Sequence, residues 1–376
     1  MNISVAQAFR SMMQVMQIIT FRLFVIVWLV QASLIASSIE TFYGAIEIEE
    51  PVLLELIESP AFQRLKHIHQ YGVMCYTLHI DEDYTRYDHS LGVLAILRAN
   101  NASLDEQVAG ILHDVSHTVF SHVGDWIFDV LNSEKDYQNS IHAQFLIRSG
   151  LEQILNKHHF TVDQILPLEE LFPMLEQKCP DLCADRIDYN IQGAFYRGYI
   201  TLNEAMEMFA DLKFEKGRWF STRVDLMEKI GRSSLILTQT CWGGATNHLL
   251  SSWLAEAILR AVELGELSVD DINFGTDQNV WDRLVKSGDY LIKRKMEMLL
   301  HVEDYFSETD PSESDMIVKS KFRGIDPWIL FEGKKQRLTT CSPIYGKDFA
   351  KVKDLVELGV AIQLNEAGEV GHKICK

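Results

Sequence analysis

The chain has 376 residues, of which 47% are hydrophobic and 23% are charged, proportions that are ordinary for a packed globular protein. This length accommodates one large domain with a smaller appendage, and the composition argues against extensive disorder. The formal net charge of −18 argues against a nucleic-acid polymer as the main partner, because phosphate backbones are bound by basic patches. A small phosphorylated substrate stays open, since a bound metal and a few local cations reverse the sign inside a pocket.

The first 38 residues are nearly uncharged. They contain only Arg10 and Arg22 as charges, followed by an apolar run over 23–30 and small residues at Ala36 and Ser38. This pattern is typical of a secretory signal, and the run over 23–39 also has about the minimum length of a membrane anchor. We predict one of these two for residues 1–38, which would make the protein exported or membrane-anchored. The alternatives are an amphipathic helix packed on the domain, or a start codon assigned too far upstream, and the protein would then be cytoplasmic.

Helical periodicity dominates from residue 39 onwards. Apolar residues recur at three- and four-residue steps over 91–100 and 104–121, as buried helices require. The same pattern covers 141–155, 182–195, 202–212, 223–240 and 248–264. Strand signals are almost absent over 39–264, and residues 266–273 are interpreted as a loop. The sequence therefore predicts a helical domain over 39–305.

The C-terminal part differs in pattern. A polar stretch over 306–315 is interpreted as an exposed loop, and beyond it short apolar runs at 328–331 and 360–364 suit strands. We therefore predict a mainly α protein, in which a helical bundle over 39–305 carries a small mixed α/β C-terminal subdomain over 316–376.

A cluster of histidines and a carboxylate lies in the middle of the helical region. On a helix, His113 and Asp114 would point about 100° apart, so both side chains can reach one ion in a groove between helices. His117 follows one turn later on nearly the same face. Imidazole and carboxylate ligands together suit a borderline divalent cation better than calcium. The alternative, that these are surface or capping residues, fits poorly with an otherwise apolar helix.

Two further ligand candidates flank this cluster. His89 stands at the start of an apolar helix, and Asp185 and Asp188 lie three residues apart on another. Each of these, taken alone, is more often a helix cap or a surface ion pair than a metal ligand. Their order and spacing around His113 and Asp114 favour the metal interpretation.

The succession His, His-Asp, Asp resembles the HD-domain superfamily of helical, metal-dependent phosphohydrolases. The resemblance is closer to the deoxynucleoside triphosphate triphosphohydrolase branch, which includes the SAM-and-HD-domain and dGTPase-like proteins. It extends over about residues 39–285, and more faintly around 322–327. The motifs that carry it lie at 62–72, 85–92, 113–122 and 185–189.

The resemblance implies a role for each matching residue. It implies one divalent metal, whose identity among Mn, Fe, Mg, Zn and Ni is open, held by His89, His113, Asp114 and Asp185. It implies a reaction centre lined by His117, His122, Asp125 and His142. It implies substrate contacts from Gln70, Arg86, Arg186 and Tyr189. The substrate is expected to be a small phosphorylated compound of nucleotide type, and a homo-oligomer is expected because relatives commonly assemble.

Physical roles follow for these residues. His117 or His122 can act as general acid or base, because imidazole titrates near neutral pH. Arg86 and Arg186 can neutralise charge that develops on phosphate oxygens. Tyr189 can stack on a sugar or base, or simply pack in the core.

The sequence also departs from the family pattern. Gly193 stands where an acidic residue often reads the sugar, and Ala143 replaces the acidic residue that usually follows His142. The cluster Tyr-x-His-Lys/Arg that grips the triphosphate has its nearest match in residues 242–245, Trp-Gly-Gly-Ala, which contain no cation. Thr118-Val119 replaces a Gly-Pro pair. A phosphodiesterase or nucleoside monophosphatase would keep the same metal centre, and a catalytically weak nucleotide-binding or scaffold protein is the alternative from another class.

Overall fold

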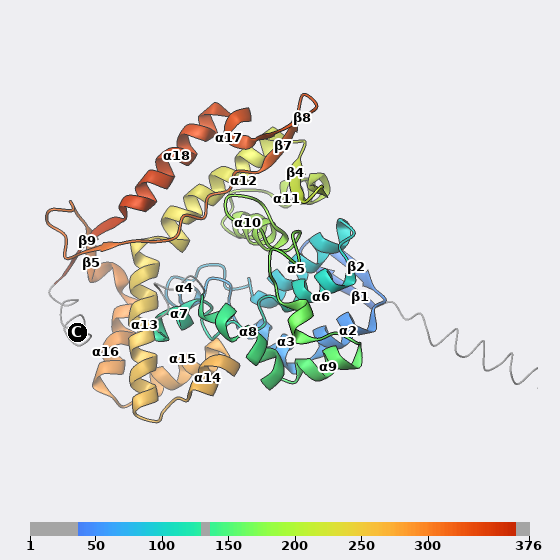
Figure 1. Cartoon of the computed structure of the whole chain (residues 1–376). Helices are drawn as coiled ribbons and strands as arrows, with labels where there is room; N and C mark the ends of the chain where they lie inside the picture. The colour runs from blue at the N-terminus through green and yellow to red at the C-terminus, as the bar shows by residue number, and fades with distance from the viewer. Residues whose placement is uncertain (1–36, 129–135, 366–376) are drawn as a thin grey trace, which may run out of the picture.

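The computed structural model of the chain describes residues 37–128 and 136–365, in which helices predominate (Figure 1). No helix in these two stretches is both long and apolar enough to cross a bilayer. The predicted signal or anchor falls almost wholly outside the described residues and stays a prediction. Only Ser37 and Ser38 of that segment are described, and they belong to the first strand, β1 (Ser37–Thr41).

Three helices form the centre of the molecule. They are α5 (Arg86–Ala99), α6 (Leu104–Leu112) and α10 (Ala184–Tyr196), and α5 packs against both of the others. A capping box between Thr85 and Asp88 starts α5, because each residue satisfies a free backbone N–H at the helix N-terminus. Gly92 lets α10 approach closely, since a Cβ there would lie 2.0 Å from Oδ1 of Asp188.

The remaining helices lie above, below and to the left of this centre in Figure 1, and β1 lies beside α5 on the right. Those before α10 are α2 (Pro51–Glu58), α3 (Pro60–Gln63), η1 (Arg64–His67), α4 (Val73–Thr77), α7 (Val123–Ile127), α8 (Tyr137–Arg148), α9 (Leu151–Lys157) and η2 (Val162–Ile165). Those after it are α11 (Leu202–Asp211), α12 (Val224–Leu237), the π-helical turn η3 (Thr238–Trp242), α13 (Ala245–Glu263), α14 (Val269–Phe274), α15 (Asp277–Lys286), α16 (Tyr290–Leu300), η4 (Val302–Asp304), α17 (Leu338–Cys341) and α18 (Pro343–Leu358).

The helix expected over 104–121 is shorter than the sequence predicted. It ends at Leu112, and residues 113–122 form an irregular loop in which Phe120 and Ser121 have positive φ angles of 54° and 59°. Tertiary contacts explain the difference, because Arg64 donates to the carbonyl oxygens of Val115 and His117 at 3.0 and 2.6 Å. These side-chain bonds satisfy backbone groups that a helix would otherwise pair. We call residues 113–122 the HD loop.

The structure differs from the sequence-based prediction in three other places. The helix expected over 141–155 is divided into α8 and α9 at Gly150, whose φ is +86°. The loop expected over 266–273 contains most of α14, which starts at a Ser268–Asp271 capping box. Four strands lie in the span expected to lack them, and their length of three to five residues is too short for a clear periodicity. They are β1, β2 (Gly44–Ile48), β3 (Lys213–Glu215) and β4 (Arg218–Ser221).

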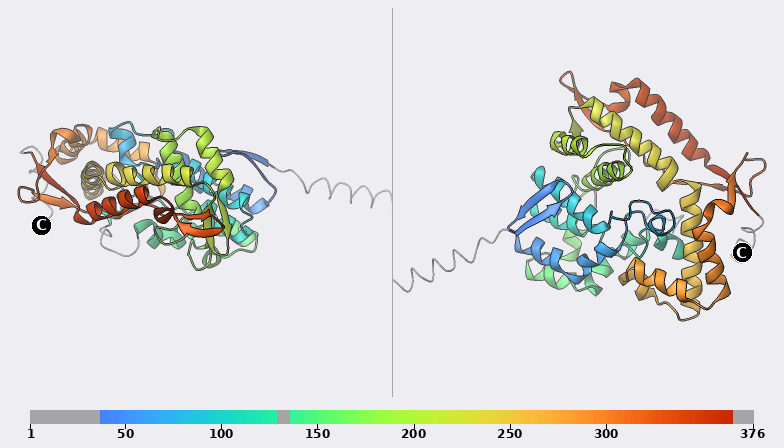
Figure 2. Two further views of the ribbon diagram at one scale, coloured as in Figure 1. Left: turned by 90° about the horizontal axis from the view of Figure 1, so that it is seen from above. Right: turned by 180° about the vertical axis from the view of Figure 1, so that it is seen from behind.

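The mixed α/β character of the C-terminal region is confirmed. The expected strands are β7 (Trp328–Phe331) and β9 (Val360–Leu364), accompanied by β5 (Phe306–Glu308), β6 (Met316–Val318) and β8 (Lys334–Arg337). The order β3-β4-β7-β8 joins this region to the helical part, because β7 pairs in parallel with β4. Helix α18 also lies along α12 (Figure 2). The domain boundaries at 305 and 316 stay predictions.

Candidate metal centre

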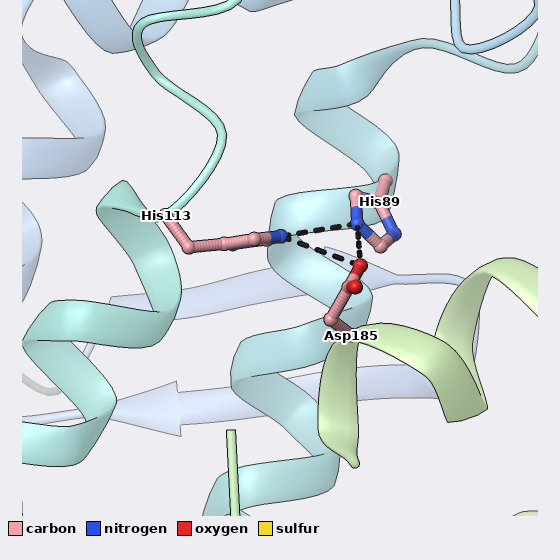
Figure 3. A group of neighbouring side chains, drawn as sticks. All are labelled: His89, His113 and Asp185. Carbon is pink, nitrogen blue, oxygen red and sulfur yellow. Dashed lines mark hydrogen bonds and ion pairs between the residues drawn. The ribbon is translucent and has the colours of Figure 1, made fainter. Parts of the chain in front are cut away.

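Three of the predicted ligands converge on one point (Figure 3). His89 comes from α5, His113 from the C-terminal end of α6, and Asp185 from the first turn of α10. Nε2 of His89 lies 3.2 Å from Nε2 of His113 and 3.0 Å from Oδ1 of Asp185. Nε2 of His113 lies 3.6 Å from the same Asp185 oxygen. One ligand atom from each residue therefore falls within 4.8 Å of the others.

The hydrogen bonds of the two rings indicate what can lie between them. Nδ1 of His113 is 2.7 Å from the carbonyl oxygen of Gly110, which can only accept, so this nitrogen carries the proton. Nδ1 of His89 is 2.7 Å from Oδ2 of Asp188 and donates in the same way. When both rings are neutral, as metal binding requires, their two Nε2 lone pairs point toward each other and toward a carboxylate. Three acceptor atoms this close repel one another unless a cation lies between them. The chemistry of these residues therefore fits a metal site.

The electrostatics of the site favour positive charge. Burial acts to lower the pKa of His89, but hydrogen bonds with Asp185 and Asp188 outweigh it and raise that pKa to about 10. Burial acts to raise the pKa of Asp185, yet the hydrogen bonds of that carboxylate with His113 and His89 hold it well below its usual range. The raised pKa of His89 reports the negative potential of the neighbouring carboxylates, and the lowered pKa of Asp185 reports donors that keep this carboxylate ionised, the form that binds a divalent cation.

Asp114 lies next to this triad. Its Oδ2 is 3.5 Å from Nε2 of His89, and its Oδ1 is 3.5 Å from Nε2 of His113 and 3.1 Å from Nε2 of His117. Burial acts to raise the pKa of Asp114, but the Arg86 guanidinium, which donates to Oδ2, and the nearby His113 outweigh it and hold that pKa well below its usual range. All four predicted ligands are therefore neighbours, with Asp114 shared between the metal position and Arg86.

A cavity of about 770 Å³ opens onto this cluster. Its walls contain nine of the twelve residues singled out from the sequence: Gln70, Arg86, His113, Asp114, His117, His122, Asp125, Asp185 and Tyr189. The other three do not face it. His89 is fully buried behind the cavity wall, and His142 and Arg186 have partners elsewhere.

The two histidines of the HD loop have different surroundings. His117 is buried, and burial together with the nearby Arg86 lowers the pKa of His117 to about 3, so its ring is neutral. The His122 ring centroid lies 5.0 Å from that of His117, but its side chain is 49% exposed and its Nδ1 is 3.7 Å from Oδ2 of Asp125. His122 therefore has the access to cavity solvent that proton exchange with a substrate requires, whereas His117 is fixed against Asp114.

Two residues implied by the family resemblance lie outside the cavity. Nδ1 of His142 is 2.7 Å from Oγ of Ser116, and burial lowers the pKa of His142 to about 4. Arg186 donates to the carbonyl oxygens of Gln177, at 3.2 Å, and Asp181, which ties down the loop before α10. The reaction-centre role of His142 and the substrate contact of Arg186 stay predictions.

The structure also adds contributions that sequence reasoning missed. Asp188, which the sequence marked beside Asp185, lies with Oδ2 2.7 Å from Nδ1 of His89 and orients that ring. Glu176 lines the cavity, and burial together with Asp185 raises the pKa of Glu176 to about 8. It lies in an irregular segment with no pattern to mark it. A third addition, the basic stretch at 319–323, comes from the C-terminal region.

Comparisons with known proteins agree with this geometry. The HD domain family matches residues 86–189, a span that begins at the start of α5 and ends within α10. The uncharacterized protein YdhJ of Bacillus subtilis is 32% identical over 296 residues, which cover 78% of this chain and 89% of that protein. The metal-dependent phosphohydrolase cns2 of Cordyceps militaris is 29% identical over 319 residues, covering 82% and 90% of the two chains. The deoxynucleoside triphosphate triphosphohydrolase SAMHD1 of Danio rerio is 36% identical over 104 residues, only 24% of this chain and 16% of that one.

The chain belongs to the HD-domain superfamily of metal-dependent phosphohydrolases, in one family with YdhJ. Membership implies a hydrolase that acts on small phosphorylated compounds with a divalent metal, and the cluster of His89, His113 and Asp185 fits such an ion.

Proposed function

We propose that this protein hydrolyses a nucleotide-type phosphoester, with one divalent metal held by His89, His113, Asp114 and Asp185. The observation that carries the proposal is the convergence of the His89 and His113 Nε2 atoms and Asp185 Oδ1 within 4.8 Å of one another, beside a cavity large enough for a nucleotide. A divalent metal at this position supplies Lewis-acid polarisation of a phosphoryl oxygen and activation of water.

The side chains around the cluster support phosphoester chemistry. Arg86 is buried beside Asp114 and lines the cavity, so its guanidinium can offset negative charge that develops on the phosphoryl oxygens. Asp125 can fix the orientation of the His122 ring, whose exposed side can deliver a proton to the departing oxygen. His117 keeps Asp114 in place through the 3.1 Å contact between its Nε2 and Oδ1.

The cavity also contains groups suited to a nucleoside. Tyr189 and Trp242 both line it, and their rings meet edge to face with centroids 5.3 Å apart. Together they form an aromatic corner on which a base or sugar can pack. Relatives often carry an acidic residue at the position of Gly193. Here Tyr71 occupies the space of that side chain, because a Cβ on Gly193 would lie 2.6 Å from the Tyr71 hydroxyl oxygen. A hydroxyl is therefore available where an acidic group is expected, which leaves deoxyribonucleoside triphosphates as one substrate to test.

A hydrolysis screen tests this proposal. Deoxynucleoside triphosphates, ribonucleoside triphosphates, nucleoside monophosphates and phosphodiesters are each incubated with the protein and with Mn²⁺, Fe²⁺, Mg²⁺, Zn²⁺ or Ni²⁺. Release of tripolyphosphate identifies a triphosphohydrolase, whereas release of orthophosphate identifies a monophosphatase.

The matched variants are Asp114→Ala and Asp105→Ala, which remove a carboxylate at the metal position and an exposed one on the neighbouring helix α6. We expect Asp114→Ala to lower turnover more than about 100-fold, because it removes a ligand and leaves Arg86 unpaired. Asp105→Ala should stay close to wild type. No turnover of any of these substrates by the wild-type protein, or equal turnover by the wild type and Asp114→Ala, would contradict the proposal.

A further inference from the structure

A basic stretch from the C-terminal region forms part of the cavity wall. Lys319, Lys321 and Arg323 all line the cavity that opens onto the metal cluster, although they follow the last metal-ligand candidate, Asp185, by more than 130 positions. The chain as a whole carries a net charge of −18, and these three cations within five residues are a local concentration of positive charge in the wall of a cavity that also contains five carboxylates.

Gly243 is what lets this stretch come close. A Cβ on Gly243 would lie 2.4 Å from Oγ of Ser320 and 2.6 Å from the carbonyl oxygen of Thr238, distances too short for any larger residue. Gly243 belongs to the Trp-Gly-Gly-Ala segment, which lacks the cation expected for gripping phosphates. The glycine at 243 leaves the space that Ser320 occupies, and Ser320 stands between Lys319 and Lys321.

Contacts on both sides hold the basic stretch in place. Val318, which precedes it, belongs to β6 and pairs with Val360 of β9. Ser234 of α12 donates to the carbonyl oxygen of Arg323 at 3.2 Å, and the Phe322 ring packs edge to face on Phe349 with centroids 5.1 Å apart. The backbone from 318 to 323 is thus positioned by the fold, which limits the ordering cost when the cations bind a ligand.

The charges on this stretch are available. Lys321 makes an ion pair with Asp136, but its side chain is still 60% exposed. Within residues 37–128 and 136–365, no hydrogen bond or ion pair reaches the side chain of Lys319 or Arg323. Arg323 lines the same cavity as Tyr189 and Trp242.

We propose that Lys319, Lys321 and Arg323 form an anion subsite that binds the phosphates of a substrate beyond the one that is attacked. This rests on the proposed function and narrows its substrate to compounds with at least two linked phosphates. The metal cluster and Arg86 serve the reacting phosphate, and the basic stretch serves the others. A monophosphate would leave these three cations without a phosphate to bind.

Calorimetric titration with inorganic tripolyphosphate and with orthophosphate tests the subsite without relying on turnover. The metal is kept in constant excess, so that chelation by the anions is the same for every protein. The test variant is Lys319→Gln/Lys321→Gln/Arg323→Gln. The matched control is Lys347→Gln/Lys351→Gln/Lys353→Gln, which removes three cations from exposed positions on α18, away from the cavity.

We expect the test variant to bind tripolyphosphate at least about tenfold more weakly than wild type, because charge-assisted hydrogen bonds to phosphate are lost. Its affinity for orthophosphate should change less than about threefold, and the control should match wild type for both anions. Lys319→Gln alone, an exposed change that leaves the fold intact, should show part of the same selective loss.

Two results would overturn the subsite. One is equal tripolyphosphate affinity in the test and control variants, and the other is an equal loss for both anions, which would place the cations at the reacting phosphate. Either result leaves the hydrolysis screen unaffected, since that screen depends on Asp114. Failure of the subsite is therefore distinguishable from failure of the proposed function.

Discussion

At the scale of single residues, Asp188 is the group on which the geometry of His89 depends. It is fully buried, and its carboxylate accepts a hydrogen bond from Nδ1 of His89 at 2.7 Å while Gln192 donates to both of its oxygens at 2.9 Å. A histidine ligand held in this way presents its other nitrogen to the metal in a fixed orientation and tautomer. Asp188 is therefore a positioning residue, one step removed from the metal.

Replacing this carboxylate by an amide tests its role. Asp188→Asn keeps the size of the side chain, but the neutral amide no longer holds the proton on Nδ1 of His89. We expect the affinity for the divalent metal to fall about 10- to 100-fold, measured by competition with a chelator of known affinity. Asp326→Asn is the control, because Asp326 is also buried and accepts two hydrogen bonds from Thr339, away from the cavity. Equal metal affinities in the two variants would refute this role.

At the scale of elements, the HD loop is held from outside by side chains of other segments. Arg64 of η1 reaches three carbonyl oxygens, those of Val115, His117 and Gly275. Asp277 of α15 accepts from the backbone N–H of Phe120 at 2.6 Å. These bonds keep the loop in a non-helical path that turns His117 toward Asp114.

Removing the guanidinium should loosen this loop. Arg64→Met is similar in length but leaves three carbonyl oxygens without their donor, each at a cost of about 1–3 kcal/mol. We expect the free energy of unfolding to fall by about 3 kcal/mol or more in a denaturant titration. The control Arg148→Met removes the exposed pair with Asp270 and a cation–π contact with Phe274, and should change the free energy of unfolding by less than about 1 kcal/mol. Similar small losses in both variants would show that Arg64 does not support the loop.

The same scale shows what the sequence can and cannot predict. His89 and Asp185 lie on α5 and α10, and the apolar residues of these two segments predicted a helix beside or around each ligand. The end of α6 at Leu112 was not, because contacts from Arg64 and Asp277 decide it, and these residues are distant in sequence. The approach of the basic stretch to the cavity depends on long-range packing against Gly243, which no local pattern reveals.

At the scale of the whole molecule, the metal position joins parts of the chain that are far apart. His89 and Asp185 are separated by 96 positions, and their helices α5 and α10 pack directly on each other. An ion between them would stabilise the folded state, since the unfolded chain cannot bring these groups together. Metal binding and thermal stability should therefore be coupled.

The thermal midpoint of unfolding, measured with and without metal, tests this coupling. At a free metal concentration 100 times the dissociation constant, binding to the folded state alone contributes about 2.7 kcal/mol. We expect a chelator to lower the thermal midpoint of the wild-type protein by several degrees, and restored metal to reverse the change. Asp114→Ala should show a much smaller metal-dependent shift. A midpoint of the wild-type protein that is independent of metal would contradict this coupling.

The central claim is that one divalent ion binds between His89, His113, Asp114 and Asp185. Anomalous diffraction at the Mn²⁺ absorption edge, from crystals grown with that metal, tests it most directly. We expect one strong peak that lies about 2.0–2.2 Å from the two Nε2 atoms and from one oxygen of each carboxylate. A peak at His122, Asp125 and Asp136 instead, or none near the two Nε2 atoms at saturating metal, would contradict it.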